Sequence, residues 1–369
     1  MSRDLLAVDA RKIHDSGIGT YITHVLPLLT ARMQETDFCL LGDPAALAPL
    51  ADGERVTVTA CRAKEYSLAE QVDVLRAVPR HADLLWVPHY NIPYFYRGRM
   101  IVTVHDAFHL AMPQYVGGAL KKCYARTMFR RVQKKAARIV TISQFSKQEI
   151  IRLSGCPAEK IRVIYNGVGR EWFEKSGAAS TFSDSSYIVY VGNVKPHKNL
   201  KTLIQAFNRI KSAVPHKLLI IGQREGFVTG ESGLEALTGA DGRIAFTGRL
   251  SDQELRRTVS GADLLVLPSL YEGFGLPPLE AMACGTAVAA SDIPPVREAC
   301  GECAAYFNPH DAEMMGQTIL QLLTDREARE RLVREGNSYV RRFTWEQCAA
   351  ELQEEMVQLM PGNGGDRHG

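Results

Sequence analysis

The segment 269–285 combines glycines, carboxylates and prolines in a spacing that suits phosphate chemistry; it reads Ser-Leu-Tyr-Glu-Gly-Phe-Gly-Leu-Pro-Pro-Leu-Glu-Ala-Met-Ala-Cys-Gly. An apolar run at 263–267 precedes it and predicts a buried strand, and the paired prolines fit only the first turn of a following helix. Gly273 and Gly275 let backbone N–H groups approach a ligand closely, and the helix start adds partial positive charge. We therefore expect this turn to hold a diphosphate.

Two carboxylates bracket that turn. Glu272 precedes it, and Glu280 follows about one turn into the predicted helix. Both side chains could not face phosphate without repulsion, so we interpret each as an acceptor for sugar hydroxyl groups. The alternative is a tight strand-to-helix turn with two solvated glutamates.

Lys198 is the candidate cation for the diphosphate. It follows the run 187–192, which predicts a strand, and its ammonium can reach a phosphate beyond the strand end. Asn199 is a possible cap of the next helix. The alternative is an ordinary solvated lysine, because single lysines are mostly exposed.

A glycine pair follows the first predicted strand. Gly17 and Gly19 lie in a loop before a helix that we expect to begin near Thr20. This arrangement is typical of dinucleotide-binding turns, but Ile22 takes the place of the third glycine and no acidic residue follows the second strand. A nicotinamide cofactor is therefore disfavoured, and a mere turn remains the alternative.

A histidine ends the predicted strand 100–105. His105 is followed by Asp106, which we expect to orient the imidazole ring. A lone histidine at a strand end is more often a structural residue, and that alternative stays open on the residues alone. His89, Tyr90 and Asn91 follow the preceding strand and could contact an acceptor.

The elements that position these residues alternate regularly. Short β-branched runs are separated by amphipathic segments, which is the βαβ rhythm of a parallel sheet covered by helices. The rhythm stops near 170, a Gly/Ser-rich stretch follows, and a second series starts at 187. We expect a first doubly wound domain at 1–170, a linker at 171–186 and a second domain at 187–345. Residues 346–369 should form a helix that packs back on the first domain and a disordered tail.

Composition limits the classes of function. The 369 residues carry a net charge of +3, too small to imply nucleic acid, and 46% are hydrophobic, an ordinary globular value. No apolar stretch approaches the roughly 20 residues of a spanning helix, and the N-terminus lacks a signal-peptide pattern, so we expect a cytoplasmic protein. The eight cysteines are scattered, and the lone Cys300–Cys303 pair is weak evidence for zinc or redox chemistry. No Asp-x-Asp occurs, so no metal or other cofactor is predicted.

The segment 120–138 is strongly basic. Its apolar residues recur every four positions from Leu120 onwards, and it contains no acidic residue. Its eight cations are Lys121, Lys122, Arg126, Arg130, Arg131, Lys134, Lys135 and Arg138. Such a basic amphipathic helix could dock on an anionic inner-membrane surface, or be a solvated face over the sheet. It lacks the aromatic platforms that RNA binding needs.

Together, these motifs resemble those of the retaining glycosyltransferases of family 4, which have the GT-B fold. The 272–285 segment resembles the family signature, and further matches at 16–21, 104–106, 141–146 and 165–168 extend the resemblance over nearly the whole chain. The stretch 190–200, Tyr-Val-Gly-Asn-Val-Lys-Pro-His-Lys-Asn-Leu, is similar to a subgroup that includes bacterial O-antigen mannosyltransferases.

The resemblance implies an α/β protein with two Rossmann-like domains facing a central cleft, the first for the acceptor and the second for a nucleotide-sugar donor. It assigns catalytic roles to three residues: His105 contacts the donor sugar near the reacting carbon, Lys198 neutralises the diphosphate, and Glu272 binds the sugar. It assigns substrate binding to the residues Gly17, Gly19, Asp106, Asn193, Arg249, Gly273, Phe274, Gly275, Leu276 and Glu280. Among these, Glu280 would bind the ribose, while Asn193 stands where other members carry Arg or Thr. Arg249 could lie over the base plane or bind phosphate, and an exposed surface arginine is the alternative.

The implied reaction is a metal-independent front-face displacement with retention, and the expected acceptor is a lipid-linked glycan. GDP-mannose is the first donor choice because the subgroup uses it, and UDP-glucose, UDP-amino sugars and dTDP-rhamnose remain open. A non-catalytic nucleotide-sugar-binding scaffold of the same fold is the alternative from another class.

Overall fold

The computed structural model describes residues 3–63, 67–174, 181–182, 185–222, 234–238 and 242–361. The chain divides into two compact units: unit 1 comprises 1–167 and 343–369, and unit 2 comprises 168–342. Part of the expected linker, at 175–180 and 183–184, and the expected tail from 362 onwards lie outside the described residues.

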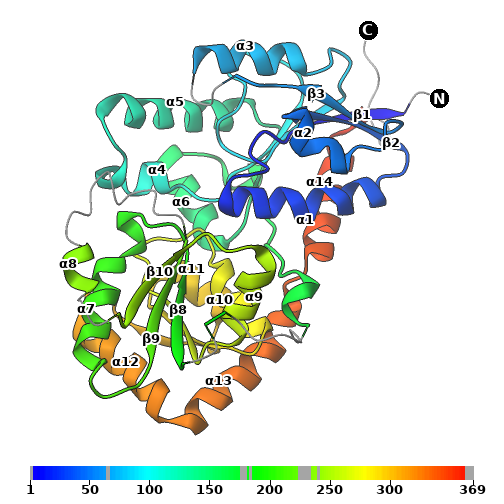
Figure 1. The fold of residues 1–369 in the computed structure, drawn as a ribbon. Coiled ribbons are helices and arrows are strands. Elements are labelled where there is room, and N and C mark those ends of the chain that lie inside the picture. The colour runs from blue at the N-terminus through cyan, green and yellow to red at the C-terminus, as the bar shows by residue number, and fades with distance from the viewer. Residues whose placement is uncertain are drawn as a thin grey trace. The chain divides into compact units, whose positions relative to one another are not determined.

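Unit 1 is built on a parallel sheet (Figure 1). The strands run in the order β3-β2-β1-β4-β5-β6-β7, and every neighbouring pair is parallel. Their bounds are β1 Asp4–Asp9, β2 Thr36–Gly42, β3 Val56–Ala60, β4 Leu84–Val87, β5 Met100–Thr103, β6 Arg138–Thr141 and β7 Ile161–Val163. All four residues of β4 and of β5 are buried, as expected for central strands covered by helices on both faces.

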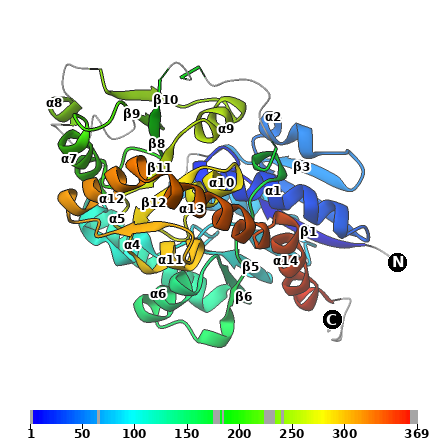
Figure 2. The same cartoon turned by 90° about the horizontal axis from the view of Figure 1, so that it is seen from below.

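The helices of unit 1 are α1 Ser16–Arg32, α2 Pro44–Leu47, α3 Leu68–Ala77, α4 Phe108–Ala111, α5 Ala119–Lys135, α6 Gln144–Ser154 and α14 Trp345–Leu359. Short 3-10 turns lie at η1 Ala48–Leu50, η2 Pro113–Tyr115 and η3 Ala158–Lys160. The C-terminal helix α14 packs against α1 and crosses it (Figure 1), and the two helices are neighbours in the second view as well (Figure 2). Trp345 stacks on His24 with ring centroids 5.0 Å apart, which fastens the end of the chain to unit 1.

Unit 2 repeats the same architecture. Its strands run β10-β9-β8-β11-β12-β13, which is the Rossmann order, and all its described pairs are parallel. Their bounds are β8 Tyr187–Val191, β9 Lys217–Ile221, β10 Ile244–Gly248, β11 Leu264–Leu267, β12 Ala287–Ser291 and β13 Ala305–Phe307. The prediction of two doubly wound α/β units is therefore confirmed.

The helices of unit 2 are α7 Leu200–Ile210, α8 Leu234–Thr238, α9 Asp252–Ser260, α10 Leu276–Ala283, α11 Pro294–Cys300, α12 Ala312–Thr324 and α13 Arg326–Tyr339. Its 3-10 turns are η4 Arg170–Trp172, η5 Pro196–Lys198 and η6 Val340–Arg342. Helices α7 and α12 pack side by side, and their apolar faces share a core with the inner faces of the strands (Figure 2).

Several helices begin where the sequence supplies a capping side chain. Ser143 accepts a hydrogen bond from the Ser146 amide at the start of α6, and Thr344 accepts one from Gln347 at the start of α14. Helix α1 differs, because the Asp15 side chain makes no capping bond and the helix starts at Ser16 rather than near Thr20. Gly17 and Gly19 therefore lie in the first turn of a helix, and the expected loop is wrong.

The structure of helix α5 differs from the prediction for the basic segment in three ways. The helix ends at Lys135, so Arg138 belongs to β6. Leu120, expected on the apolar face, is 87% exposed, because the buried face starts one turn later at Ala125. Arg131 is held within unit 1, since its Nε donates to the Tyr94 carbonyl at 2.8 Å. Among the described residues, none of the helices is long and apolar enough to cross a membrane.

Candidate active site

The turn between β11 and α10 forms as the sequence indicates. Gly275 precedes the helix with φ 117°, in the region that strains any residue with a side chain, and Phe274 beside it is buried. Leu276 opens α10, and the two prolines that follow have no N–H to donate. The backbone N–H donors at the start of this helix are therefore those of Gly275 and Leu276, in the turn that is predicted to hold a diphosphate.

Lys198 and Glu272 are brought together from the ends of neighbouring strands. Lys198 follows β8 and Glu272 follows β11, and β8 pairs directly with β11. The Lys198 ammonium lies 2.7 Å from Glu272 Oε1 in a partly buried ion pair. One predicted cation and one predicted sugar-binding carboxylate thus share a site, and the glycine turn follows Glu272 directly in the chain.

Ser269 completes this cluster and was missed by the sequence reasoning. Its side chain is fully buried, and its hydroxyl donates to Glu272 Oε1 at 2.7 Å. A sequence signal for this contact exists, because a serine that lies three residues before a glutamate, just after a buried strand, can hydrogen-bond to that glutamate. A hydroxyl in a strand-end loop has too many other uses to be assigned from sequence alone.

Asn199 is a second residue whose role was mistaken. It has φ 60°, and its side chain does not cap the amides of α7. Its Nδ2 instead donates to the carbonyls of Pro268 at 3.0 Å and Pro309 at 2.7 Å. Asn199 therefore ties the loop after β8 to the loops after β11 and β13, which fixes the backbone beside Lys198.

Three further predicted residues of unit 2 are Glu280, Asn193 and Arg249. Glu280 is half-buried in α10, and Asn193 follows β8, with its carbonyl accepting from the Tyr190 hydroxyl at 3.1 Å. Arg249 is exposed after β10, two strands from β8 in the sheet. Adjacent strands are about 4.8 Å apart, so this strand end lies about 10 Å from the end of β8.

In unit 1, His105 is positioned by Pro88. The ring Nε2 lies 3.0 Å from the Pro88 carbonyl, and because a carbonyl oxygen only accepts, Nε2 carries the hydrogen. Burial lowers the pKa of His105 to about 4, against the opposing effect of this hydrogen bond. The ring is therefore neutral at pH 7, and Nδ1 keeps its lone pair as an acceptor.

Asp106 does not orient that ring, so this expectation is wrong. Its Oδ1 accepts from the Phe108 amide at 2.9 Å, which stabilises the start of α4. The second neighbour of His105 comes from α1: the Tyr21 ring meets the imidazole edge to face, with centroids 4.9 Å apart. The helix that carries the glycine pair is thus in contact with His105.

The two glycines of α1 differ in their surroundings. A Cβ on Gly19 would lie 2.4 Å from the Ile13 carbonyl oxygen, so this position needs glycine for packing alone. A Cβ on Gly17 would meet nothing within 4 Å, and the residue is exposed. Of the pair, only Gly17 leaves open backbone that a ligand could approach.

His89 and Asn91 are buried, so the expectation that they meet an acceptor is wrong for both. His89 Nε2 lies 3.2 Å from Asp9 Oδ2, and Asn91 Nδ2 donates to Glu70 Oε1 at 2.8 Å. Arg11 joins the two carboxylates, with Nη2 2.7 Å from Asp9 and Nη1 2.6 Å from Glu70.

Burial alone would raise the pKa of the Asp9 carboxyl, but His89 and Arg11 hold it below its ordinary value. This network links the ends of β1 and β4 to the start of α3. Its members lie up to 82 residues apart in the chain, so no local sequence pattern predicts it.

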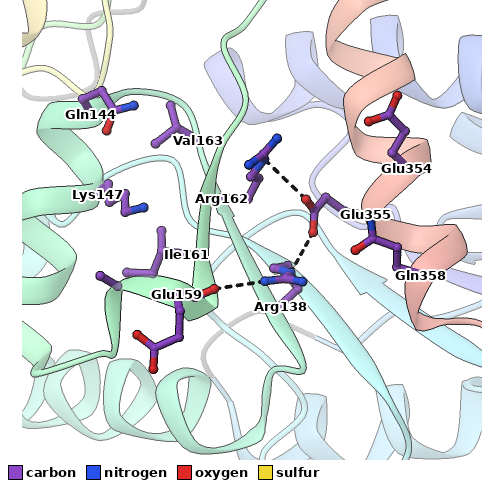
Figure 3. Close-up of a pocket in the computed structure, with 11 residues that line it drawn as sticks. Arg138, Gln144, Lys147, Glu159, Ile161, Arg162, Val163, Glu354, Glu355 and Gln358 are labelled. Carbon is purple, nitrogen blue, oxygen red and sulfur yellow. Dashed lines mark hydrogen bonds and ion pairs between the residues drawn. The ribbon is translucent and has the colours of Figure 1, made fainter.

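A polar pocket of about 620 Å³ opens elsewhere in unit 1, between α6, β7 and α14 (Figure 3). Glu355 lies between two guanidinium groups, 2.7 Å from Arg138 and 3.4 Å from Arg162. None of the predicted catalytic or substrate-binding residues lines this pocket. Arg138 is paired here, and it is not available to the basic face of α5.

The Cys300–Cys303 pair shows no sign of thiolate chemistry. Both cysteines are buried free thiols, and burial raises the pKa of each above its ordinary value. Nucleophilic, redox and metal-binding cysteines need a thiolate, so the surroundings of this pair disfavour those uses.

Comparison with protein families agrees with this geometry. Residues 16–172 match the family described as Glycosyltransferase Family 4, and residues 173–339 match Glycosyl transferases group 1. Among curated proteins, O-antigen chain mannosyltransferase B of Escherichia coli is 29% identical over 275 residues, covering 72% of this chain and 71% of that protein. O-antigen chain mannosyltransferase RfbU of Salmonella typhimurium is 30% identical over 263 residues, covering 71% and 70%.

Solved structures agree on the fold. Sucrose-phosphate synthase from Thermosynechococcus elongatus aligns with a TM-score of 0.79 at 20% identity, covering 97% of this chain and 99% of that one. Anabaena HepE in complex with UDP and glucose aligns with a TM-score of 0.76 at 17% identity, covering 96% and 100%.

The Rossmann-like sheets of the two units and the likeness to these solved structures identify the GT-B fold, and the predicted fold class is confirmed. The chain belongs to glycosyltransferase family 4 and is a hexosyltransferase.

Proposed function

We propose that this hexosyltransferase moves mannose from GDP-mannose to a glycan acceptor, lipid-linked, in the assembly of an O-antigen-type polysaccharide. The donor and pathway are suggested by the mannosyltransferases named above, which act in O-antigen synthesis by their names. The observation that carries the proposal is the Lys198–Glu272 pair beside the glycine turn, because it joins a cation for diphosphate to a carboxylate for sugar hydroxyls.

Unit 2 holds the donor in this proposal. The Lys198 ammonium and the amides of Gly275 and Leu276 neutralise the diphosphate as the bond to the anomeric carbon breaks. Glu272 accepts hydrogen bonds from the sugar, Glu280 from the ribose, and Arg249 lies along the base. The charge on the leaving group is balanced by protein groups, so the reaction needs no divalent metal ion.

The stereochemistry follows from a front-face displacement. The acceptor hydroxyl oxygen bonds to the anomeric carbon on the face from which the diphosphate departs, and its proton passes to a diphosphate oxygen. Neutral His105 suits this step, since its Nδ1 can accept a hydrogen bond from a hydroxyl group without adding positive charge near an oxocarbenium-like carbon. The product keeps the anomeric configuration of the donor.

Docking on the cytoplasmic face of an anionic membrane would bring the enzyme to a lipid-linked acceptor. We define the basic face as the exposed cations of α5, which are Lys121, Arg126, Arg130, Lys134 and Lys135. Leu120, at the start of the same helix, is available to insert among headgroups. Each cation near an anionic surface contributes about 1 kcal/mol.

A vesicle experiment tests this docking. Replacing Arg130, Lys134 and Lys135 with Gln should lower co-sedimentation with phosphatidylglycerol-containing vesicles by at least tenfold at low salt. The matched control replaces three exposed cations of unit 2, Lys195, Lys201 and Arg209. Equal loss in both variants, or no loss in either, would remove the basic face from the account.

The transfer reaction itself is tested with GDP-mannose and a lipid-linked glycan acceptor in buffer containing EDTA. The proposal predicts a mannosylated product whose new linkage has the anomeric configuration of the donor, read by NMR coupling constants. A product of inverted configuration would overturn the mechanism, and a strict metal requirement would overturn the role given to Lys198. Transfer only from a UDP or dTDP sugar would keep the reaction and discard mannose.

A further inference from the structure

Within the part of the chain that the structure describes, the Glu272 carboxylate is held through one of its two oxygens. Its Oε1 receives both the Lys198 ammonium and the Ser269 hydroxyl, each at 2.7 Å. These two donors occupy the hydrogen-bond acceptor positions of Oε1. They leave Oε2 as the oxygen that can receive a further donor.

The proposed function places a competing anion beside one of these two donors. A diphosphate group attracts the Lys198 ammonium away from Glu272, because a lysine side chain is flexible and its charge is a single point. Ser269 has no such competitor, since its hydroxyl is fully buried. With donor bound, Ser269 is therefore the contact that continues to hold Oε1.

The backbone around Ser269 is fixed on both sides. The Pro268 carbonyl before it accepts from Asn199 Nδ2 at 3.0 Å, and the Leu270 amide after it donates to the His197 carbonyl at 2.8 Å. Both partners belong to the loop that carries Lys198. A hydroxyl on so constrained a backbone can set the direction of a carboxylate.

We propose that Ser269 is a positioning residue that keeps Glu272 Oε2 directed at the donor sugar while Lys198 binds the diphosphate. This inference rests on the proposed function, and it adds that sugar recognition and phosphate recognition are separable in this cluster. Nucleotide affinity depends on Lys198, whereas the gain in affinity from the attached sugar depends on Ser269 through Glu272.

The test compares the affinities of Ser269→Ala and wild type for GDP and for GDP-mannose by calorimetry, together with kcat. A hydrogen bond to a charged group is worth about tenfold to hundredfold. Ser269→Ala should keep GDP affinity within about twofold, lose about tenfold or more of the preference for GDP-mannose over GDP, and lower kcat by a similar factor. Ser269→Thr, which keeps the hydroxyl, should recover most of the preference.

The matched control is Ser260→Ala, an exposed serine in α9 whose hydroxyl bonds only within its own helix. An unchanged sugar preference and kcat in Ser269→Ala would overturn the proposal, as would equal losses for GDP and GDP-mannose. If wild type prefers another nucleotide sugar, the same comparison is made with that sugar and its free nucleotide. The donor assignment would then fail while the role of Ser269 is still decided.

Discussion

The proposed chemistry of unit 2 depends on two charged side chains, Lys198 after β8 and Glu272 after β11. Lys198 is the cation in direct contact with Glu272, and the pair leaves the cluster electrically neutral before a ligand arrives. The ammonium that a diphosphate attracts is therefore already at the site, paired with Glu272 until the ligand arrives. Its positional accuracy comes from Asn199, the next residue, whose side chain spans two neighbouring loops.

Replacing Lys198 with Ala should lower kcat on the order of 100-fold, because the departing diphosphate loses its neutralising cation. Steady-state transfer assays measure this effect. Lys195→Ala is the matched control, since Lys195 is an exposed lysine three residues earlier and should behave as wild type. Near-wild-type turnover in Lys198→Ala would exclude that residue from the mechanism.

His105 should make stability depend on pH. Its folded pKa of about 4 lies below the ordinary value of 6.5, so the unfolded chain binds the proton first. This contribution is fully present above pH 6.5 and is lost as the pH falls towards 4. Urea unfolding between pH 7 and 4 should show a steeper loss of free energy for wild type than for His105→Gln, which cannot titrate. Parallel curves for the two proteins would show that the ring is not buried in its neutral form.

At the scale of elements, the start of α1 contains one glycine that packing requires and one that packing does not require. The helix begins earlier than its residues suggest, and the carbonyl of Asp15, the residue before it, accepts from the Gly19 amide. Gly19 is consequently pressed against Ile13, while Gly17 faces outwards. Two glycines that look equivalent in the sequence thus have different reasons to be glycine.

Gly19→Ala should destabilise the protein by roughly 1–3 kcal/mol, since the new methyl group meets a backbone carbonyl that cannot give way cheaply. Gly17→Ala should leave the unfolding free energy unchanged or raise it by about 0.5 kcal/mol, because alanine favours the helix. Urea unfolding measures both. If Gly17 lies against a ligand, its variant loses transfer activity without losing stability. Equal destabilisation of the two variants would contradict the difference in packing.

At the scale of the whole molecule, the regular alternation of strands and helices was enough to predict the fold. Apolar runs such as 84–87 and 264–267 are buried on both faces, and that requires a parallel sheet between helices. The same topology predicts that ligand-binding residues lie in the loops after the strands, because ligands bind at the carboxyl ends of parallel strands. The Lys198–Glu272 contact joins residues 74 positions apart, and the Rossmann order brings their strands together.

What the sequence could not supply was the choice of side-chain partners. Asp106 and Pro88 are both plausible neighbours of His105, and only the packed structure shows that the carbonyl holds the ring. Ser269 and Asn199 make their decisive contacts across loops, where no periodicity constrains them. His89 lies buried against Asp9, which comes from a distant segment of the chain.

The central claim is that the protein binds a guanine nucleotide sugar without a metal ion. The most direct measurement is thermal unfolding in the presence of GDP, GDP-mannose, UDP-glucose and dTDP-rhamnose, each with and without EDTA, because a ligand of the folded state raises Tm by mass action. The account predicts a selective rise with GDP and GDP-mannose that survives EDTA. A selective rise with UDP or dTDP compounds, a rise that EDTA abolishes, or no rise with any of them would contradict it.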